Sequence, residues 1–508
     1  MAARTEQEQV RFSKLKALRE AGFAFPNDVK LTANCRTVSE LQPLPVEEAP
    51  IHTVAGRLVQ MRIMGKASFA HILDESGKLQ IYVTRDDLGV EAYQEFKKLD
   101  LGDIVETSGY VFVTKTGEKT LHVKTLRLLT KSLIPLPEKW HGLTDVESRY
   151  RYRYVDLIAN PEVREIFKKR ARIIREIRSF LDNRGFVEVE TPVLTYVAGG
   201  AAARPFETFY NALDCNMYVR IALELPLKKL VVGGLERVYE IGRVFRNEGL
   251  SKKHNPEFTM IEFYQAYATY QDLMDLTEQL ICDLALKVRG SLKFQYCGRE
   301  LDLTPPWPRI SMLESIYQIG GLERTIDIRT LEGARDAATK RGVELSDPQD
   351  WGKCLDNLWE ELVEDKLFNP VFIIHHPFSI SPLARRNQED PNITDRFELI
   401  MGCMEVANAF SELNDAEDQR SRFEAQARRR AAGDHEANAI DEDFLRALEY
   451  GMPPTAGEGI GIDRIVMLLT DSATIRDVLL FPQLKPLEVE QAEDSEGSEV
   501  EAFGGAKD

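Results

Sequence analysis

The segment from Phe245 to Tyr264 places a group that could bind a phosphate beside groups that could stack on a base. Arg246 ends a run rich in Val, Tyr, Ile and Phe, and arginine holds phosphate and carboxylate oxygens in a fixed geometry. Four side chains then recur at the interval of two that puts them on one face of a strand: Phe258, Met260, Glu262 and Tyr264. Turn-forming residues between the two runs predict a nucleotide-binding hairpin over 237–264. The alternative is an ordinary amphipathic hairpin with a surface arginine.

Two acids, Glu398 and Glu405, interrupt an otherwise apolar run. Buried carboxylates are costly unless they are paired or bind a metal, and two carboxylates together with phosphate oxygens make a Mg²⁺ site. Their odd spacing would put them on opposite faces of a regular strand, so this prediction requires a bulge or break near Gly402. The next three candidate residues are spaced by two and share a face: Asn408, Phe410 and Glu412. The alternative is a pair of surface acids on an edge strand.

Three glycines alternate within the segment Thr455 to Leu469, at Gly457, Gly459 and Gly461. The context of a dinucleotide fingerprint is missing, so we expect a strand against which a ligand can lie closely. Arg464 follows in the first turn of a predicted helix, where a cation opposes the helix dipole and a bound polyphosphate would offset that cost. Glu224 precedes another predicted helix, and a solvated side chain is the simplest interpretation of it alone.

The elements that must carry these residues fall into two regions. From about residue 51 to 138, five short strand-like runs with one helical insert predict a small Greek-key barrel of the oligonucleotide-binding type. Phe69 and Gln80 would lie on neighbouring strands, where an aromatic ring can stack on a base and an amide can read its edge. A place for Phe69 in the barrel core is the alternative. A helical extension, residues 1–50, precedes the barrel.

The rest of the chain predicts a mixed α+β region. After a linker at 139–160, a long amphipathic helix over 161–183 leads into a strand that ends at Pro192. Antiparallel-looking strands with helices between them continue to residue 487, with a helix-rich insertion at about 301–368. The acidic segment 488–508 has few bulky residues and predicts a disordered tail.

The net charge, the lengths of the apolar runs and the cysteine pattern exclude some classes of protein. The net charge of −17 argues against a protein that wraps nucleic acid over its whole surface, although it permits a local site. No apolar run reaches the roughly 20 residues that span a membrane. Six scattered cysteines without a CxxC pair predict neither a disulfide framework nor a zinc site, and favour a reducing cytoplasm.

Taken together, these motifs resemble those of the class II aminoacyl-tRNA synthetases. The stretches VEVETPVL, FRNEG and GEGIGIDR resemble the three signature motifs of that class, and the barrel resembles that of the subclass charging Lys, Asp or Asn. Segments such as HNPEFTMIEFY, FSELND and SPLARRN resemble the lysyl-tRNA synthetase family, and the resemblance extends over about 5–487. It implies an α+β protein, with an oligonucleotide-binding barrel followed by an antiparallel-sheet catalytic domain with flanking helices.

The resemblance also implies an activity and roles for residues. The family joins lysine to ATP as lysyl-adenylate, releases pyrophosphate, and transfers lysine to the 3′ end of tRNA(Lys). Catalysis rests on positioning and charge stabilisation by Arg246 and Arg464. The residues implied to bind ATP are Arg246, Glu248, His254, Asn255, Phe258, Glu405 and Arg464. Mg²⁺, of which the family usually binds up to three ions per subunit, would be held by Glu398 and Glu405.

Recognition of lysine and tRNA follows in the same way. The residues implied to bind lysine are Gly200, Glu224, Arg246, Glu262, Tyr264, Asn408, Phe410 and Glu412. Several carboxylates around one ammonium suit lysine and would repel aspartate. Phe69 and Gln80, with Glu118 as a third contact, are implied to read the anticodon. The family is typically a cytoplasmic homodimer.

Two rival functions are an aspartate- or asparagine-specific synthetase and a catalytically impaired paralogue that binds tRNA. Three positions depart from the family pattern. Pro226 follows Glu224 where the family has a proline before it, Tyr210 replaces a histidine, and Glu458 stands at a position that is usually apolar.

Overall fold

The computed structural model describes residues 4–137, 143–433 and 439–486, and the chain divides into two compact units, Met1–Thr144 and Asp145–Asp508. The predicted tail at 488–508 lies outside the described residues. Within the described ranges, no helix is both long and apolar enough to cross a membrane.

The first unit contains a closed five-stranded barrel with strand order β1-β2-β3-β5-β4. Its elements are β1 His52–Met64, β2 Ala67–Leu73, β3 Lys78–Thr84, α3 Arg85–Leu88, α4 Val90–Lys97, β4 Ile104–Val113 and β5 Lys119–Thr130. Alternate residues point into the barrel, so Ala70 and Ile81 are fully buried whereas Phe69 and Gln80 lie on the outer face. The predicted five-stranded barrel is confirmed. Its insert holds two short helices, α3 and α4, where one was expected, and the core position considered for Phe69 is wrong.

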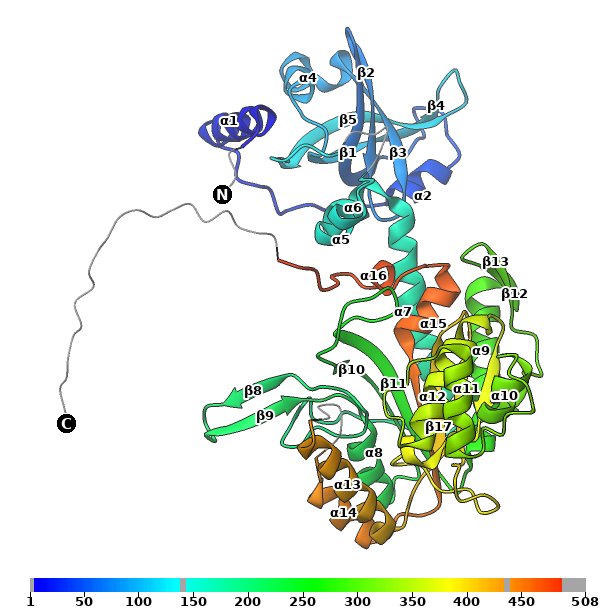
Figure 1. Ribbon diagram of the computed structural model, residues 1–508. Helices are drawn as coiled ribbons and strands as arrows, with labels where there is room; N and C mark the ends of the chain where they lie inside the picture. The colour runs from blue at the N-terminus through cyan, green and yellow to red at the C-terminus, as the bar shows by residue number, and fades with distance from the viewer. Residues whose placement is uncertain (1–3, 138–142, 434–438, 487–508) are drawn as a thin grey trace, which may run out of the picture. The chain divides into compact units, whose positions relative to one another are not determined.

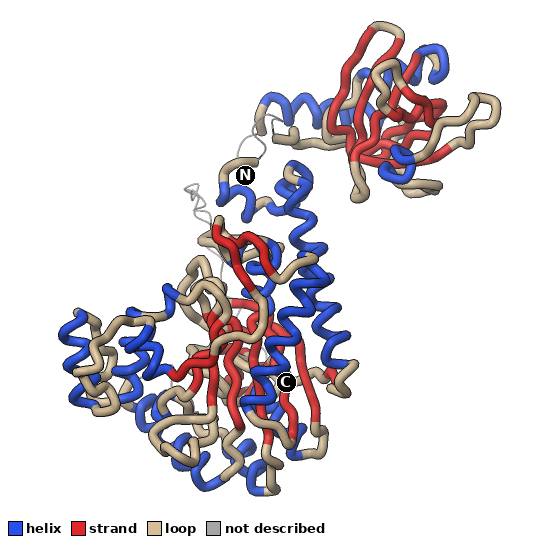
Figure 2. Tube along the Cα trace, turned by 90° about the vertical axis from the view of Figure 1, so that its right-hand side faces the viewer, coloured by secondary structure: helices blue, strands red, loops and turns tan. Residues whose placement is uncertain are grey.

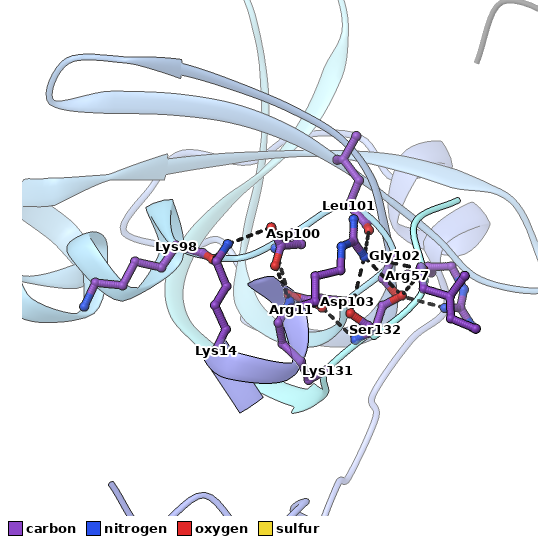
Figure 3. A network of polar contacts seen from close by, with 11 residues as sticks. Arg11, Lys14, Arg57, Lys98, Asp100, Leu101, Gly102, Asp103, Lys131 and Ser132 are labelled. Atoms are coloured by element: carbon purple, nitrogen blue, oxygen red, sulfur yellow. Dashed lines mark hydrogen bonds and ion pairs between the residues drawn. The ribbon is translucent and has the colours of Figure 1, made fainter. Parts of the chain in front are cut away.

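A helical extension precedes the barrel, with α1 Glu6–Glu20 and α2 Cys35–Glu40. Lys14 on α1 donates a hydrogen bond to Asp100 at 2.8 Å, and the buried Lys131 contacts Asp100 at 2.5 Å and Asp103 at 2.9 Å (Figure 3). Arg11 donates to the carbonyl of Leu101 at 3.0 Å. These contacts tie α1 to the loop before β4.

The second unit is built around an eight-stranded sheet with strand order β14-β15-β16-β17-β18-β11-β10-β6 (Figures 1 and 2). The β14–β15 and β10–β6 pairs are parallel and the other pairs are antiparallel. The sheet strands are β6 Val187–Glu188, β10 Arg237–Phe245, β11 Glu257–Ala266, β14 Arg309–Ser311, β15 Val371–Ile374, β16 Arg396–Ile400, β17 Glu405–Ser411 and β18 Thr455–Gly461. The predicted hairpin over 237–264 is confirmed as β10 and β11.

Helices cover the sheet on both faces. One face packs against α7 Pro161–Asp182, α9 Tyr270–Arg289 and α15 Ile462–Thr470 through a large apolar core. Ile261 and Phe263 of β11 belong to this core, so the alternate residues of β11 face the other way, as the spacing predicts. On the opposite face, α8 Glu224–Val232 and α14 Glu442–Glu449 pack with parts of β10 and β11.

The remaining elements flank this sheet. Short helices α5 Val146–Arg151 and α6 Arg153–Ala159 occupy most of the segment expected to be a linker. The three-stranded sheet contains β7 Leu194–Thr195, β8 Glu207–Tyr210 and β9 Cys215–Val219. The region around the expected insertion holds β12 Lys293–Tyr296, β13 Arg299–Asp302, α10 Met312–Gln318, α11 Leu331–Arg341, α12 Trp351–Leu362 and the 3-10 helices Glu364–Lys366 and Phe378–Ile380. Two helices complete the second unit, α13 Ala416–Ala431 before α14 and α16 Ile475–Val478 after α15.

The predicted strand up to Pro192 is shorter than expected. The strand β6 comprises Val187 and Glu188, and Val189 donates one further backbone hydrogen bond to the carbonyl of Tyr239 at 2.9 Å before the chain leaves the sheet. Proline lacks the N–H that a central strand donates, which is consistent with this early end.

Candidate functional site

A cavity of about 310 Å³ lies on the α8 side of the sheet, against β11, β17 and β18. Thirteen predicted site residues line it: Gly200, Glu224, Arg246, Glu248, His254, Asn255, Phe258, Glu262, Tyr264, Glu405, Asn408, Phe410 and Arg464. Two others, Glu398 and Glu412, are neighbours of this lining on β16 and directly after β17. The cavity therefore joins residues that are separated by more than 250 positions in the sequence.

One end of the cavity carries two arginines. The guanidinium of Arg246 lies over the ring of Phe258, 5.1 Å from its centroid, and its Nε donates to the carbonyl of Ile221 at 3.3 Å. Arg464 lies in the first turn of α15, 3.5 Å from the carboxylate of Glu405. Cations beside an aromatic ring, with carboxylates near them, form a site for a polyphosphate attached to a base.

His254 and Asn255 support this end of the cavity through the turn between β10 and β11. His254 Nδ1 is 2.9 Å from Ser251 Oγ, and its Nε2 is 3.2 Å from Arg464 Nη2. Burial and then the charge of Arg464 lower the pKa of His254, so the neutral ring can accept from Arg464. The Asn255 amide donates to the Glu257 carbonyl at 2.6 Å and accepts from Gln483 N at 3.3 Å. These hydrogen bonds give Asn255 a part in shaping the turn.

Glu398 and Glu405 come together through a hairpin and a bulge. Gly402 adopts a positive φ of 64° in the connecting turn, and the pairing of β16 with β17 shifts by one residue at Leu399 and Ile400. This shift puts one extra residue into β17 after Glu405, so Glu405 shares a face with Asn408, which lies opposite Glu398. The predicted bulge or break near Gly402 is confirmed, and neither acid lies on an edge strand.

The two acids are suited to a hard cation. Glu398 is in contact with Arg396, and Glu405 keeps a side chain that is 43% exposed. Burial, and to a lesser degree the negative charge of Glu405, raises the pKa of Glu398 to about 8 in spite of Arg396. A divalent cation would relieve this repulsion, and carboxylate oxygens are ligands that Mg²⁺ accepts. The described residues contain no cluster of three or more acids, histidines or cysteines that could hold a metal without the substrate's oxygens.

The other end of the cavity is acidic and buried. Glu224, Glu262 and Glu412 are each at most 6% exposed. Glu262 accepts from the backbone N–H of Leu223 at 2.9 Å and from the hydroxyl of Tyr264 at 2.9 Å. Burial raises the pKa of Glu262 to about 7 and that of Glu412 to about 8. A bound ammonium group would favour the ionised carboxylates, so this end is built for a cation.

Lys228 is the counter-ion of this acidic end, and sequence reasoning missed it. Its Nζ lies 2.8 Å from Glu224 Oε1 and 2.6 Å from Glu412 Oε2, and its side chain is completely buried. Burial alone would lower the pKa of Lys228, but the two carboxylates hold it above its usual value. The available signal was the spacing of Glu224 and Lys228, four residues apart on one helix, which is most often a surface ion pair. The solvated Glu224 considered from the sequence is therefore wrong.

Two departures from the family pattern have local explanations. Pro226 lies in the first turn of α8, where the missing N–H has no intrahelical partner in any case, so α8 begins normally at Glu224. Glu458 on β18 is buried against α9, where Thr277 Oγ1 is 2.6 Å from Glu458 Oε1. Tyr210 is an exposed residue at the end of β8.

Gly457 leaves space that two pocket side chains occupy. A Cβ at this position would lie closer than 3.0 Å to the ring of Tyr264 and to Glu412 Oε1. Gly457, Gly459 and Gly461 all line the cavity, which agrees with the expected close approach of a ligand to this strand, and at Gly457 the side chains of Tyr264 and Glu412 occupy the place of a Cβ. The glycine is needed because both side chains must approach β18 to reach the cavity.

The barrel carries a second cluster of predicted residues on its outer face. The rings of Phe69 and Tyr82 are 4.8 Å apart, and Tyr82 also contacts Phe112 and His122 at 5.6 and 5.2 Å. The amide of Gln80 donates to Glu118 Oε2 at 2.7 Å. Sequence reasoning missed Tyr82, although its spacing of two from Gln80 on one strand was the available signal. The result is an aromatic surface beside an amide held by a carboxylate.

Comparisons with known proteins identify two families in this chain. Residues 145–485 match the family described as tRNA synthetases class II (D, K and N), and residues 52–129 match the family described as OB-fold nucleic acid binding domain. The chain is 54% identical over 490 residues to the lysine–tRNA ligase of Moorella thermoacetica, an alignment that covers 96% of this chain and 99% of that protein. The lysine–tRNA ligases of Thioalkalivibrio sulfidiphilus and Coxiella burnetii (strain Dugway 5J108-111) are 56% and 53% identical. These alignments each cover 94% of this chain, and 96% and 98% of those proteins.

Proposed function

Because this chain belongs to the class II tRNA synthetases of the aspartate, lysine and asparagine group, we propose that it is a lysine–tRNA ligase whose catalytic site is the 310 Å³ cavity. It activates L-lysine with ATP to lysyl-adenylate and pyrophosphate, and then transfers lysine to the 3′ end of tRNA(Lys). The observation that carries this proposal is the division of one cavity into a cationic end and a buried end with three carboxylates.

The cationic end binds ATP. Phe258 stacks on adenine, Glu248 contacts its amino group, and Arg464 covers the other face and reaches the terminal phosphate. Arg246, at the cationic end, bridges the lysine carboxylate and the α-phosphate. The 3.2 Å contact between His254 and Arg464 fixes the direction of the arginine fork.

The acidic end binds lysine. Glu262, Tyr264 and Glu412 surround the side-chain ammonium, while Gly200 and Glu224 receive the α-ammonium. Asn408 contacts the carboxylate and Phe410 packs on the aliphatic chain. Three carboxylates would repel the side chain of aspartate and gain nothing from asparagine, which disfavours a synthetase specific for either amino acid.

The activation step requires no protein nucleophile. An oxygen of the lysine carboxylate attacks the α-phosphorus, the bond to the bridging oxygen breaks, and pyrophosphate leaves. Arg246 and Arg464 position the reactants and stabilise the charge that develops on the phosphate oxygens. Glu398 and Glu405 would hold Mg²⁺, which when bound neutralises charge on those oxygens.

The barrel recognises the anticodon of tRNA(Lys). Phe69 stacks on a base, and Gln80 reads the edge of another while Glu118 holds its amide. The 2.7 Å hydrogen bond between Gln80 and Glu118 supports this role because it fixes the orientation of the amide before RNA binds.

The active form is a homodimer in the cytoplasm. Seven large apolar side chains between α7 and β9 are exposed in a single chain: Val187, Val193, Leu194, Tyr196, Phe209, Tyr210 and Leu213. A second copy of the chain would cover these side chains. Sedimentation of the purified protein tests this by measuring whether its mass is that of a dimer. All six cysteines are free, as suits a reducing compartment.

Amino-acid-dependent ATP–pyrophosphate exchange tests the proposed activity. Lysine, but neither aspartate nor asparagine, should support exchange, and Arg246→Ala should abolish it. Phe69→Ala, which lies in the barrel, is the control and should leave exchange intact. A native protein that supports no exchange with any of the three amino acids would favour an impaired tRNA-binding paralogue and overturn the proposal.

A further inference from the structure

Lys228 is a fully buried cation inside a pocket that we assign to a cation. Its Nζ contacts one oxygen of Glu224 and one oxygen of Glu412, at 2.8 and 2.6 Å. The rings of Phe410 and Phe444 lie 5.9 and 5.3 Å away, so the ammonium is enclosed by two acids and two aromatic faces. A buried ammonium with this many partners cannot exchange them for water.

The second oxygen of Glu412 has no partner of its own. Glu412 Oε1 is buried and makes no hydrogen bond within the described residues, although the same carboxylate is bonded to Lys228 through Oε2. Glu412 Oε1 faces Gly457 and the ring of Tyr264, both of which line the cavity. A buried acceptor without a donor is costly, and a donor brought by the substrate would satisfy it.

The charges of the pocket balance only when Lys228 is counted. Three carboxylates line or adjoin this end of the cavity, and the substrate brings two ammonium groups, since its own carboxylate faces Arg246. Without Lys228 the three carboxylates would face two cations in a region closed to water. With Lys228, three ammonium groups meet three carboxylates.

We propose that Lys228 is a specificity-determining residue whose ammonium sets the charge of the amino-acid pocket, leaving two carboxylate charges for the two ammonium groups of the substrate. This inference rests on the proposed function. Lys228 acts through Glu224 and Glu412, and through them orients the acceptor that receives the side-chain ammonium. Glu262 and Tyr264 on β11 and Arg396 on β16 complete the charged surroundings.

A pair of variants isolates this charge balance. Glu412→Gln removes one carboxylate while Lys228 remains, so the pocket keeps a single net negative charge for two ammonium groups. We expect the KM for lysine in ATP–pyrophosphate exchange to rise by about 100-fold, because a charge-assisted hydrogen bond and a balancing charge are both lost. The KM for ATP should stay within about twofold of native, since the nucleotide end is untouched.

Adding Lys228→Met to the Glu412→Gln variant should then lower its KM for lysine. The double variant Lys228→Met/Glu412→Gln again has two carboxylates for two ammonium groups, and it removes a buried ion pair as a unit rather than one partner alone. We expect its KM for lysine to fall about tenfold below that of Glu412→Gln. A residue that only supports the fold would make the double variant worse than the single one.

Lys229→Met is the matched control. Lys229 is the next residue on α8, and its ammonium is paired with Asp443 at 2.7 Å outside the pocket. This change should leave the KM for lysine native in both the wild-type and Glu412→Gln backgrounds. Lys228→Met alone leaves three uncompensated carboxylates and should lower the melting temperature.

The outcomes separate the inference from the function on which it rests. No lysine-dependent exchange by the native protein would refute the proposed function. Exchange by the native protein, together with a double variant whose KM for lysine equals or exceeds that of Glu412→Gln, would overturn the role of Lys228 alone.

Discussion

Among the residues that the structure describes, no cation lies beside the buried carboxyl group of Glu458 on β18. It is 1% exposed, and its hydrogen-bond partner on α9 is Thr277 Oγ1, at 2.6 and 2.7 Å from its two oxygens. Thr277 Oγ1 also lies 2.7 Å from the carbonyl of Leu273, which can only accept. A hydroxyl has one proton, so if Thr277 donates to Leu273, the carboxyl of Glu458 must be protonated and donate to Thr277.

Burial also favours the protonated form of Glu458. It raises the pKa of Glu458 well above its usual value, and even a hydrogen bond donated by Thr277 would lower this pKa by less than burial raises it. A carboxyl whose pKa is raised on folding stabilises the native state at low pH, and this contribution is lost as pH rises above the unfolded pKa towards the folded one. The loss is at most about 1.4 kcal/mol per pH unit for a single group.

The variant Glu458→Gln allows the contribution of Glu458 to the pH dependence of stability to be measured. Glutamine has nearly the same shape, can donate to Thr277 as the protonated acid does, and does not titrate. We expect the stability of Glu458→Gln relative to native to increase from pH 5.5 to pH 7.5, by up to about 1.4 kcal/mol per pH unit, measured from denaturant unfolding of both proteins at each pH. The matched control is Glu300→Gln, which changes an exposed carboxylate on β13 and should show no such trend.

A stability difference between Glu458→Gln and native that is the same at both pH values would mean that Glu458 is ionised in the folded protein in spite of its burial, contrary to this prediction.

Three further changes test other parts of the site. Gly457→Ala should raise the KM for lysine at least about tenfold with the KM for ATP unchanged, because the added Cβ would collide with Tyr264 and Glu412; equal changes for both substrates would contradict this. Phe69→Ala should raise the KM for tRNA(Lys) in aminoacylation by about 10-fold or more and leave pyrophosphate exchange native, and unchanged aminoacylation would exclude stacking by Phe69. Arg464→Met should raise the KM for ATP by about tenfold or more with little effect on lysine, and selective loss of lysine binding would argue against its assignment to the nucleotide.

The local parts of the fold followed from the sequence. Alternation by two predicted which residues of β11 face the cavity, and the odd spacing of Glu398 and Glu405 correctly required a bulge. Both patterns are visible because strand geometry repeats every two residues and any irregularity must be compensated nearby.

Contacts between distant segments could not be predicted in this way. Lys228 meets Glu412 across 184 positions, and Glu458 meets Thr277 across 181. Considered singly, a Glu and a Lys four residues apart on a helix indicate a surface pair, and a glutamate in a glycine-rich strand has no predicted partner. Their burial depends on how α8 and α9 pack against the sheet, which no local pattern specifies.

We propose that one cavity holds the nucleotide at its arginine end and the lysine side chain at its acidic end. A crystal structure of the protein with a non-hydrolysable lysyl-adenylate analogue would locate both groups. We predict adenine stacked on Phe258 and the side-chain ammonium within about 3 Å of both Glu262 and Glu412. An analogue bound with its ammonium group away from these carboxylates, or with its adenine away from Phe258, would contradict the account.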